Sequence, residues 1–433
     1  MNTRLLHTTI FSVGLVLLLS ACGFFFSNED LGQHGQLTLY LGESDSSRAV
    51  YDPPVKLPTF SAVTISINGK TVSYTRGSNN SYNVPIPEEK NYTVDIKAVV
   101  NHSGNDSFPF IKSLEGSAEG PFKNNAAAIP LSLRETEVVL LGQPSGGQSV
   151  LFSYADPADG TPINVTNLGI QINNSISPFD FDPYGNLFIW NHVNDKFQLT
   201  KVNKDKNEAV TDIIENRPYG IGYDRKGGRV YYTTKVWVVV TDVLTLYSVD
   251  STGTKQQQWT DSEGVFGYFS DQQFVSTHND GNDTFIYVGV DTGNLSTLFA
   301  TNIPTILKFK QENNNVTFIG SAAVGSNAHI RDLKVIDDTV YVIIGSDNDS
   351  NILALDVNAP IVNEVINISN AKVLQAAAGT YHFQRIVGWD DDAIHVFEWR
   401  APDIRRITKL QRGGELATIG TSINLDDTIY WRQ

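Results

Sequence analysis

The chain has 433 residues, of which 41% are hydrophobic and 10% aromatic, enough to build sizeable apolar cores. It carries 32 Lys and Arg residues against 47 Asp and Glu residues, a formal net charge of −15 at pH 7. Such an acidic surface repels nucleic acid, so we expect no nucleic-acid partner. A single cysteine excludes an intramolecular disulfide and a thiolate zinc site, so we expect the apolar core alone to hold the fold.

Residues 1–21 have the pattern of a signal peptide. A short N-terminal segment that contains Arg4 precedes an apolar run from Ile10 to Leu19. The run has the length of a signal-peptide core and falls short of the about 20 residues that a helix needs to cross a bilayer. We therefore expect removal of this segment, with an uncleaved N-terminal anchor as the alternative.

The run ends in Leu19-Ser20-Ala21-Cys22, which places the only cysteine directly after two small residues. This tetrapeptide resembles the lipobox of bacterial lipoproteins. The resemblance implies cleavage after Ala21 and attachment of a diacylglycerol to the Cys22 thiol. The new amino group then carries a further acyl chain, such as palmitate, or remains free. Two or three acyl chains give stable membrane attachment where a single chain does not.

These features predict a lipid-anchored protein of the bacterial cell envelope that meets the membrane through its N-terminal lipid. Gly23 stands where some bacterial lipoproteins carry the aspartate associated with inner-membrane retention, so the outer membrane or the cell surface is favoured. Residues 22–36, which end in the polar sequence SNEDLGQHGQ, are expected to form a lipidated tether.

The rest of the chain has the pattern of an all-β protein. Runs of four to eight residues rich in Val, Ile, Thr, Tyr and Phe alternate with clusters of Asn, Asp, Gly and Ser. No segment of helical length shows the periodicity of an amphipathic helix. We expect two β domains, at residues 37–135 and 145–433.

The first domain, residues 37–135, is expected to be an immunoglobulin-like β-sandwich that acts as a spacer. Apolar and polar side chains alternate in Val63–Ile67, and Asn68-Gly69 is a hairpin-turn signal. Short strands with frequent turns are typical of such sandwiches, although the Cys–Trp–Cys pattern of antibody domains is missing. The expected strands are 37–41, 62–69, 71–75, 82–86, 92–100 and 128–133.

The second domain, residues 145–433, contains a repeat. An aspartate is followed, after a short gap, by an aliphatic residue and then an aromatic residue or histidine. Successive copies lie 35 to 56 residues apart, and a four-stranded propeller blade takes about 40–50 residues. The six copies are Asp182 with Leu187-Phe188, Asp224 with Val230-Tyr231, Asp280 with Ile286-Tyr287, Asp338 with Val340-Tyr341, Asp392 with Ile394-His395, and Asp427 with Ile429-Tyr430.

Two copies share a longer frame, in residues 177–189 and 217–224, where a proline opens a strand and an aspartate closes it. This frame resembles the repeat of NHL and SMP-30/gluconolactonase-type six-bladed β-propellers. The resemblance implies a six-bladed propeller, with seven blades as the alternative. We expect strands at 149–154 and 163–168 to complete the last blade, whose inner strands come from residues 418–431, so that both ends of the propeller close one blade.

The sequence predicts no catalytic residue and no metal ligand. The resemblance implies a metal held by a glutamate, asparagines and an aspartate in lactonases of this type, but those ligands cannot be matched one by one here. The repeat aspartates are expected to make turn hydrogen bonds. Asp347–Asn351 has the alternating oxygens of a calcium loop without its glycine and final acid, and Asp390-Asp391-Asp392 is an acidic turn. We expect no cofactor, with calcium as the one ion left open.

We therefore predict a monomeric, non-enzymatic binding or scaffold module for a protein or glycan partner. Its partner-binding residues are unknown. The alternative is a metal-dependent lactonase or hydrolase of the SMP-30/gluconolactonase type, so enzymatic activity stays open. Candidate anchors for a partner are Trp190, Trp259, Trp389 and Trp399-Arg400. The alternative role of each of these tryptophans is packing between blades.

Overall fold

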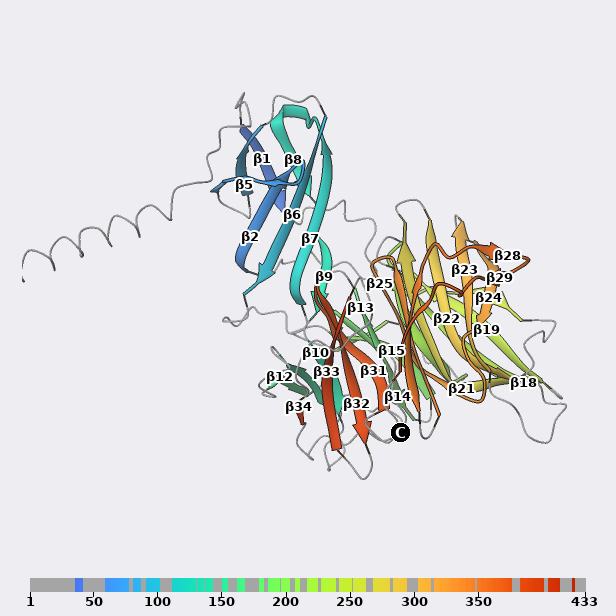
Figure 1. The fold of residues 1–433 in the computed structure, drawn as a ribbon. Coiled ribbons are helices and arrows are strands. Elements are labelled where there is room, and N and C mark those ends of the chain that lie inside the picture. The colour runs from blue at the N-terminus through green and yellow to red at the C-terminus, as the bar shows by residue number, and fades with distance from the viewer. Residues whose placement is uncertain are drawn as a thin grey trace, which may run out of the picture. The chain divides into compact units, whose positions relative to one another are not determined.

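The computed structural model is almost entirely β-structure, which confirms the predicted all-β class (Figure 1). The signal peptide, Ala21, Cys22 and the tether up to residue 35 lie outside the described residues. Among the described residues, no helix is long and apolar enough to cross a membrane. The residues that the structure describes are 36–41, 59–77, 81–86, 91–101, 111–129, 131–136, 138–142, 150–154, 162–167, 179–182, 186–194, 196–202, 207–210, 216–224, 227–238, 241–250, 252–261, 268–280, 283–293, 303–312, 315–346, 349–375, 382–400, 404–412 and 423–424.

Two sheets form before residue 137. One has the strand order β4-β5-β1-β8 and the other β3-β2-β6-β7-β9. Buried and more exposed positions alternate along β6, which gives that strand one face toward a core. The elements are β1 (Gln36–Leu41), β2 (Phe60–Ile67), β3 (Lys70–Thr71), β4 (Thr75–Arg76), β5 (Ser81–Pro85), β6 (Tyr92–Val100), β7 (Ile111–Gly120), the 3₁₀ turn η2 (Lys123–Asn125), β8 (Ala126–Ile129) and β9 (Ser132–Thr136).

The hairpin predicted at Asn68-Gly69 is confirmed. Ile67 pairs with Lys70 across it, and both turn residues have positive φ angles, 49° and 75°. A two-residue turn with two positive φ angles matches the right-handed twist of the flanking strands, and asparagine and glycine tolerate that conformation best. This turn was therefore readable from two residues alone.

Strand β7 is the longest strand of this region and is missing from the predicted set. Its sequence IKSLEGSAEG carries two glycines and two glutamates and lacks a clean apolar alternation. It nevertheless lies in the middle of its sheet, between β6 and β9, and Leu114 pairs with Leu133. Its neighbours, rather than its own composition, make it a strand.

The chain separates into two compact units. The borders fall inside β2, β6 and β7, so they do not follow the expected domain ranges 37–135 and 145–433, which stay predictions. The first unit comprises Met1–Ser44, Val63–Lys97 and Gly116–Pro130, and the second comprises Asp45–Ala62, Ala98–Glu115 and Leu131–Gln433.

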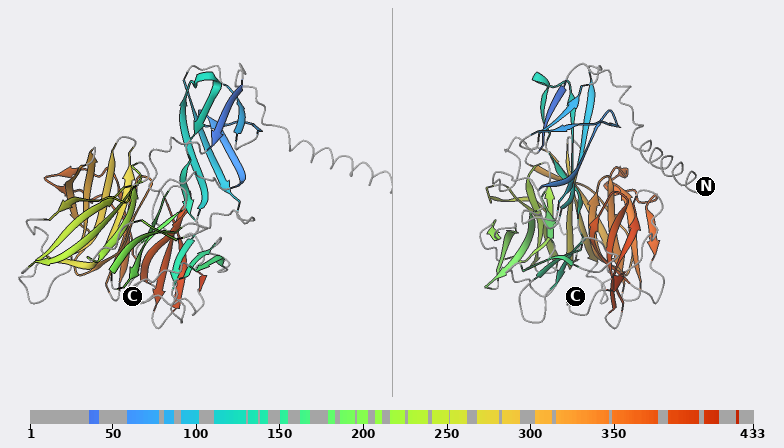
Figure 2. Two further views of the ribbon diagram at one scale, coloured as in Figure 1. Left: turned by 180° about the vertical axis from the view of Figure 1, so that it is seen from behind. Right: turned by 90° about the vertical axis from the view of Figure 1, so that its left-hand side faces the viewer.

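Six further sheets follow in chain order within the second unit, and most are simple antiparallel meanders (Figures 1 and 2). The fourth of them adds a small hairpin, giving the order β21-β22-β23-β24-β29-β28, and the fifth has the order β25-β26-β27-β30. The strands of the first three sheets are β10 (Val138–Gly142), β11 (Val150–Tyr154), β12 (Pro162–Asn167); β13 (Phe179–Phe181), β14 (Leu187–Val193), β15 (Lys196–Val202), β16 (Asn207–Ala209); β17 (Pro218–Asp224), β18 (Arg229–Val238), β19 (Thr241–Val249) and β20 (Lys255–Thr260).

The last three sheets complete the set. Their strands are β21 (Tyr268–Asn279), β22 (Thr284–Gly293), β23 (Ile303–Glu312), β24 (Asn315–Ala323), β28 (Ile361–Val362), β29 (Val365–Ile366); β25 (His329–Ile336), β26 (Thr339–Gly345), β27 (Ser350–Asp356), β30 (Lys372–Gln375); β31 (His382–Trp389), β32 (Ala393–Arg400), β33 (Ile404–Gln411) and β34 (Ile423–Asn424).

Apolar cores lie between consecutive sheets. One cluster joins Phe188 and Trp190 of β14 to Tyr223 of β17 and Tyr232 of β18. Two more clusters join the β17–β20 sheet to the β21–β24 sheet, and that sheet to the β25–β27 sheet. The sheets are therefore stacked face to face, each buried on the side of its neighbours, which explains why every residue of β17 is buried.

Side-chain hydrogen bonds also join the first strands of consecutive sheets. In each case a side-chain oxygen on one first strand accepts a backbone N–H from the first strand of the next sheet. The pairs are Tyr223 N–H to Asp180 (2.8 Å), Val335 N–H to Ser276 (2.9 Å) and Ile386 N–H to Asp332 (2.7 Å).

First strands of sheets that are not consecutive also meet. Asp180 of β13 pairs with Lys334 of β25, and the Arg385 guanidinium of β31 lies 4.5 Å from the centre of the Phe274 ring of β21. Sheets stacked around an axis bring only their innermost strands together in this way. The first strands are therefore innermost, and the second unit has the arrangement of a β-propeller.

The closure of the last blade by strands from both ends of the propeller stays a prediction. Residues 150–154 and 162–167 pair with each other and with β10, whose sequence VVLLG lies in the segment left between the two expected domains. The last sheet takes β34 as its outer strand, and most of residues 418–431 lies outside the described residues. In the described residues, β11 lies between the apolar β10 and β12.

The aspartates of the predicted repeat mark one type of turn in the sheets of the second unit. The first five lie at the turns between the first and second strands of five sheets, and Asp427 lies outside the described residues. Turn hydrogen bonding is confirmed for Asp182, which accepts the Asn186 N–H at 2.8 Å, and for Asp280, which accepts the Asp283 N–H at 2.8 Å. We call this end of the sheets the turn end and the opposite one, where the innermost strands begin, the start end.

Candidate binding site on the innermost strands

Four consecutive innermost strands are bulged near the start end. The pairing with the second strand shifts register between Tyr219 and Gly222 in β17, and between Phe269 and Gln273 in β21. It shifts again after Ile330 in β25 and after Phe383 in β31. A bulge adds unpaired residues to one strand and turns their side chains away from the regular alternation. The bulges therefore let several polar side chains collect near the middle of the propeller.

The first contact in this region is the ion pair between Lys334 and Asp180. Both side chains are largely buried, and the Lys334 ammonium also lies 5.8 Å from the centre of the Trp389 ring. An ammonium over an aromatic face gains electrostatic energy, and an opposite charge compensates its desolvation. Lys334 is thus held by a carboxylate and an indole from two other sheets.

Asp332 stands two residues earlier on β25. Its two carboxylate oxygens accept the N–H groups of Leu333 at 2.9 Å and Ile386 at 2.7 Å. Burial raises the pKa of Asp332, while the positive charge of Arg385 opposes that change. This carboxylate therefore serves mainly to hold β31 against β25.

Arg385 of β31 is a charged residue with side-chain N–H groups that lack hydrogen-bond acceptors in the described chain. Its charged end is enclosed, although the residue as a whole is only partly buried. Its Nε and Nη1 atoms are buried and have no hydrogen-bond partner in the described chain. Burial lowers the pKa of Arg385 to about 10, which keeps the guanidinium charged at neutral pH. Stacking on Phe274 orients the guanidinium without satisfying its N–H groups.

A second guanidinium, that of Arg331, lies next to this one. Arg331 donates through Nη2 to the Ser346 carbonyl at 2.5 Å and through Nη1 to the Phe383 carbonyl at 3.4 Å. A side chain at Gly345 would bring its Cβ to 2.7 Å from the Arg331 Nε, so the glycine leaves room for the guanidinium. The positive charge of Arg331 adds to the effect of burial in lowering the pKa of Arg385, because like charges disfavour a second cation.

Three further polar atoms of the innermost strands are buried without a partner in the described chain. They are the Gln273 Oε1, the His382 Nδ1 and the Gln384 Nε2. Burial, and then the charge of Arg331, lower the pKa of His382, so its ring is neutral at pH 7. We call Phe274, Arg331, Asp332, Lys334 and Arg385, with Asp180, the inner cluster.

The start end carries one more buried carboxylate, Asp291 of β22. It accepts the Ile330 N–H at 2.7 Å, and its other oxygen lies 2.8 Å from the Nδ1 of His329. Burial raises the pKa of Asp291, against the lowering effect of these hydrogen bonds. The carboxylate joins two sheets and orients the half-exposed imidazole.

The acidic triplet predicted as a turn is compensated by cations. The Asp390 Oδ1 accepts the N–H groups of Asp392 and Ala393, which makes the turn, and its Oδ2 lies 3.1 Å from the Lys409 ammonium. Asp391 pairs with Arg134 at 2.6 Å.

The described residues contain no group of three or more His, Cys, Asp or Glu side chains placed to hold a metal ion. Asp347 and Asn348 of the expected calcium-like loop lie outside the described residues.

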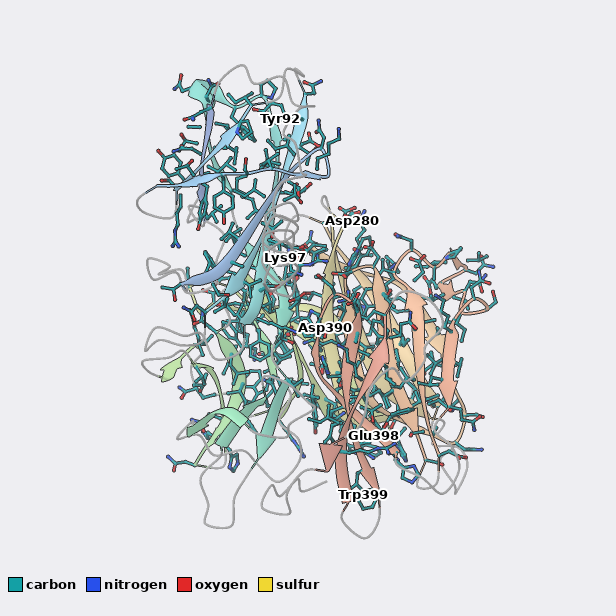
Figure 3. All side chains as sticks on the ribbon, turned by 60° about the vertical axis from the view of Figure 1, so that its left-hand side comes forward. Tyr92, Lys97, Asp280, Asp390, Glu398 and Trp399 are labelled. Atoms are coloured by element: carbon teal, nitrogen blue, oxygen red, sulfur yellow. The ribbon has the colours of Figure 1, made fainter. Side chains whose placement is uncertain are left out.

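Packing explains three of the four predicted tryptophan anchors. Trp190 and Trp389 are buried, and Trp259 packs against Phe309 and Phe318. Trp399 is half-buried and lies at the end of the sheets opposite Asp280 (Figure 3). Trp237 is not among the predicted anchors, yet it is 56% exposed between exposed Val236 and Val238 near the tip of the β18–β19 hairpin.

The inner cluster was also missed at the sequence level. A signal was present, because the strand HIRDLKVI and the strand HFQRIVGW both place charges inside otherwise apolar runs. Charged residues in a strand that is buried on both faces need partners, so such positions are candidates for a polar site. Which of them meet depends on the bulges and on the order of the sheets.

No protein-family model and no curated protein sequence matches the chain. Solved structures resemble it weakly. TolB from Acinetobacter baumannii has a TM-score of 0.45 and 7% identity, covering 84% of this chain and 80% of its own. A mutant of the Aleuria aurantia lectin in complex with Fucα1-6GlcNAc has a TM-score of 0.39 and 9% identity, covering 78% of this chain and 93% of its own. At these identities the likeness concerns the fold alone.

Proposed function

We propose that this chain is a lipid-anchored binding or scaffold protein of the bacterial cell envelope whose propeller recognises a protein or glycan partner. The observation that carries the proposal is the inner cluster, where the buried Nε and Nη1 of Arg385 have no partner in the described chain. Buried polar groups are normally hydrogen-bonded, and those that are not call for an explanation. A ligand that supplies the missing acceptors is such an explanation.

The start end is the face that we assign to the partner. It carries Trp237, which is 56% exposed, and the half-buried Trp399. The innermost strand β31 begins there at His382, whose Nδ1 has no partner in the described chain. Tryptophan and arginine are the residues that most often anchor a partner at interfaces. The turn end, by contrast, carries the aspartates whose oxygens serve their own turns.

The finer features of the fold belong to the same proposal. We infer that the six sheets from β10 to β34 are six blades of an NHL-like or SMP-30-like propeller, supported by their order in the chain. We infer that the sheets of β1 to β9 form an immunoglobulin-like sandwich that serves as a spacer, supported by their alternating burial.

Lipid anchoring rests on Leu19-Ser20-Ala21-Cys22, and its test is separate. The Cys22→Ala variant should accumulate as an uncleaved precursor without acyl chains, seen by mass spectrometry and by labelling with a fatty acid. The Ser20→Ala variant keeps two small residues before the cysteine and serves as the matched control that stays processed. A Cys22→Ala protein that is processed and membrane-bound like the wild type would refute the anchor. Fractionation of the wild type then tests the outer-membrane assignment.

The binding proposal is tested by site-specific photocrosslinking in cells. A photoreactive amino acid replaces Trp237 at the start end or Asp338 at the turn end, whose side chains are both well exposed. We expect a discrete crosslinked species from position 237 and none from position 338. Equal crosslinking from both positions, or none from either position together with no retention on a glycan array, would contradict a partner at the start end.

A further inference from the structure

The guanidinium of Arg385 has donors that the described protein does not use. Nε carries one N–H and Nη1 carries two, so three of its five N–H groups are buried without an acceptor. The Cζ atom of this guanidinium lies over the Phe274 ring, 4.5 Å from its centre. A charged group with unused donors in a defined orientation is already arranged for an acceptor from outside the chain.

Keeping this cation enclosed without a partner is costly. Burying a charge that lacks a hydrogen-bonded counter-ion is among the most unfavourable events in folding. Asp332 attracts Arg385 electrostatically, but its two oxygens accept backbone N–H groups on β25 and β31. The nearby guanidinium of Arg331 adds a second positive charge, which repels Arg385. The arrangement becomes favourable when an anion enters.

We propose that the Arg385 guanidinium binds the carboxylate group of a ligand. The inference rests on the proposed binding function and names the chemistry that the inner cluster recognises. Arg331, held by the carbonyls of Ser346 and Phe383, supplies the second positive charge beside the carboxylate. The guanidinium fork matches the planar carboxylate, and such charge-assisted hydrogen bonds are about twice as strong as neutral ones.

The charge of the inner cluster favours a monoanion. Arg331, Lys334 and Arg385 are three cations. Asp180 pairs with Lys334, and Asp332 accepts N–H groups through both oxygens, as a carboxylate does, so two carboxylates face three cations. One negative charge from a carboxylate balances the excess. A phosphate dianion would leave an excess of negative charge next to two enclosed aspartates, in a chain whose net charge is already −15.

The test is isothermal titration calorimetry of the full chain in detergent with four probes. D-Glucuronate is compared with neutral D-glucose, and N-acetyl-alanine is compared with N-acetyl-alanine amide. We expect at least one carboxylate to bind about 10- to 100-fold more tightly than its neutral match, since a hydrogen bond to a charged group is lost in the neutral compound. Preference for the sugar acid assigns a glycan source, and preference for the amino acid assigns a peptide C-terminus.

The variant Arg385→Gln should abolish that preference while leaving the melting temperature equal or higher, because it removes an enclosed cation without a partner. Arg217→Gln is the matched control, since Arg217 also stacks on an aromatic ring, that of Tyr219, at 5.2 Å. It should keep the wild-type preference. Arg385→Lys keeps the charge but lacks the fork, so its preference should be intermediate.

Three results would overturn the proposal. The first is equal affinity for both carboxylates and their neutral matches. The second is tighter binding of glucose 6-phosphate than of either carboxylate. The third is an unchanged preference in Arg385→Gln. None of these results would contradict the photocrosslinking at position 237, so the carboxylate site and the broader binding function fail separately.

Discussion

Lys334 of β25 and Asp180 of β13 form an ion pair although 154 residues separate them in the sequence. Asp180 also accepts the Tyr223 N–H at 2.8 Å, so one carboxylate connects three innermost strands. The pair therefore holds the middle of the propeller together, where neither side chain is much exposed to water.

Replacing Asp180 by asparagine should destabilise the second unit. The asparagine oxygen still accepts the Tyr223 N–H, but the Lys334 ammonium loses its counter-charge. Removing one partner of a buried ion pair costs about 3–5 kcal/mol, and we expect the lower end because solvent reaches part of the lysine. Urea unfolding measures the change. The double variant Asp180→Asn, Lys334→Gln should recover at least half of the loss, and losses that simply add would show that the two residues do not interact.

Trp389→Phe tests the hydrogen bond between β31 and the segment before β10. The Trp389 indole N–H donates to the Arg134 carbonyl at 2.9 Å, and its backbone N–H donates to the Thr136 hydroxyl. Phenylalanine keeps an aromatic ring but leaves the carbonyl without that donor.

Trp190→Phe is the matched control, because Trp190 is equally buried and its indole N–H has no partner in the described chain. Both variants lose similar ring area, so the difference between them isolates the hydrogen bond. We expect Trp389→Phe to lower the free energy of unfolding by about 1–2 kcal/mol more than Trp190→Phe. Equal losses in chemical denaturation would contradict a role for the indole N–H.

Asp390 should contribute to the acid sensitivity of the protein. Burial disfavours its charge, but hydrogen bonds from His395 and Lys409 outweigh that effect and hold the pKa below its ordinary value of 3.8. The folded pKa is thus lower than the unfolded one. The contribution of Asp390 is full above the unfolded pKa and is lost as the pH falls below 3.8 toward the folded pKa.

The measurement is the free energy of unfolding at pH 5, 4, 3 and 2.5. The wild type should lose stability more steeply than Asp390→Asn between pH 4 and 2.5, because only the wild type has the shifted carboxylate. At pH 5 the variant should be the less stable of the two. Parallel pH profiles for the two proteins would show that Asp390 does not titrate as its contacts require.

Gly220→Ala tests the close approach of two innermost strands. Gly220 has a φ of +60°, and a Cβ there would lie 2.7 Å from Val275 Cγ2 and 2.9 Å from the Val275 backbone nitrogen. The left-handed conformation costs roughly 1–2 kcal/mol for alanine, and overpacking adds about 1–3 kcal/mol.

Gly69→Ala provides the comparison. Gly69 has a φ of +75°, and nothing lies within 4 Å of its added Cβ, so only the backbone cost applies. We expect thermal unfolding to show a larger loss for Gly220→Ala than for Gly69→Ala by about 1–3 kcal/mol. Equal losses would mean that the β17 and β21 strands separate to accept the methyl group.

Local features were predictable because short-range chemistry decides them. The Asn68-Gly69 turn follows from two residues that tolerate positive φ angles. The repeated aspartates mark hairpin turns because their side chains bond to N–H groups only a few residues away, as Asp182 does to Asn186. The all-β class follows from composition and from the absence of helical periodicity.

Pairings between distant strands were not predictable in the same way. Strand β10 falls between the two expected domains. Its sequence VVLLG is apolar, but a short apolar run does not say which strand will be its partner. Strand β7 was missed because its glycines and glutamates hide its alternation, and only the strands on both sides of it keep it extended.

The amino-acid sequence alone thus determined the strand-rich class, the turn positions and the repeat of the second unit, since these depend on residues within a few positions of each other. Only the tertiary structure decided that Lys334 meets Asp180 and that Arg385 meets Phe274. These contacts depend on bulges in the innermost strands and on the stacking of sheets far apart in the chain. Burial then leaves Arg385 with unused donors, a property of packing that no short segment of sequence contains.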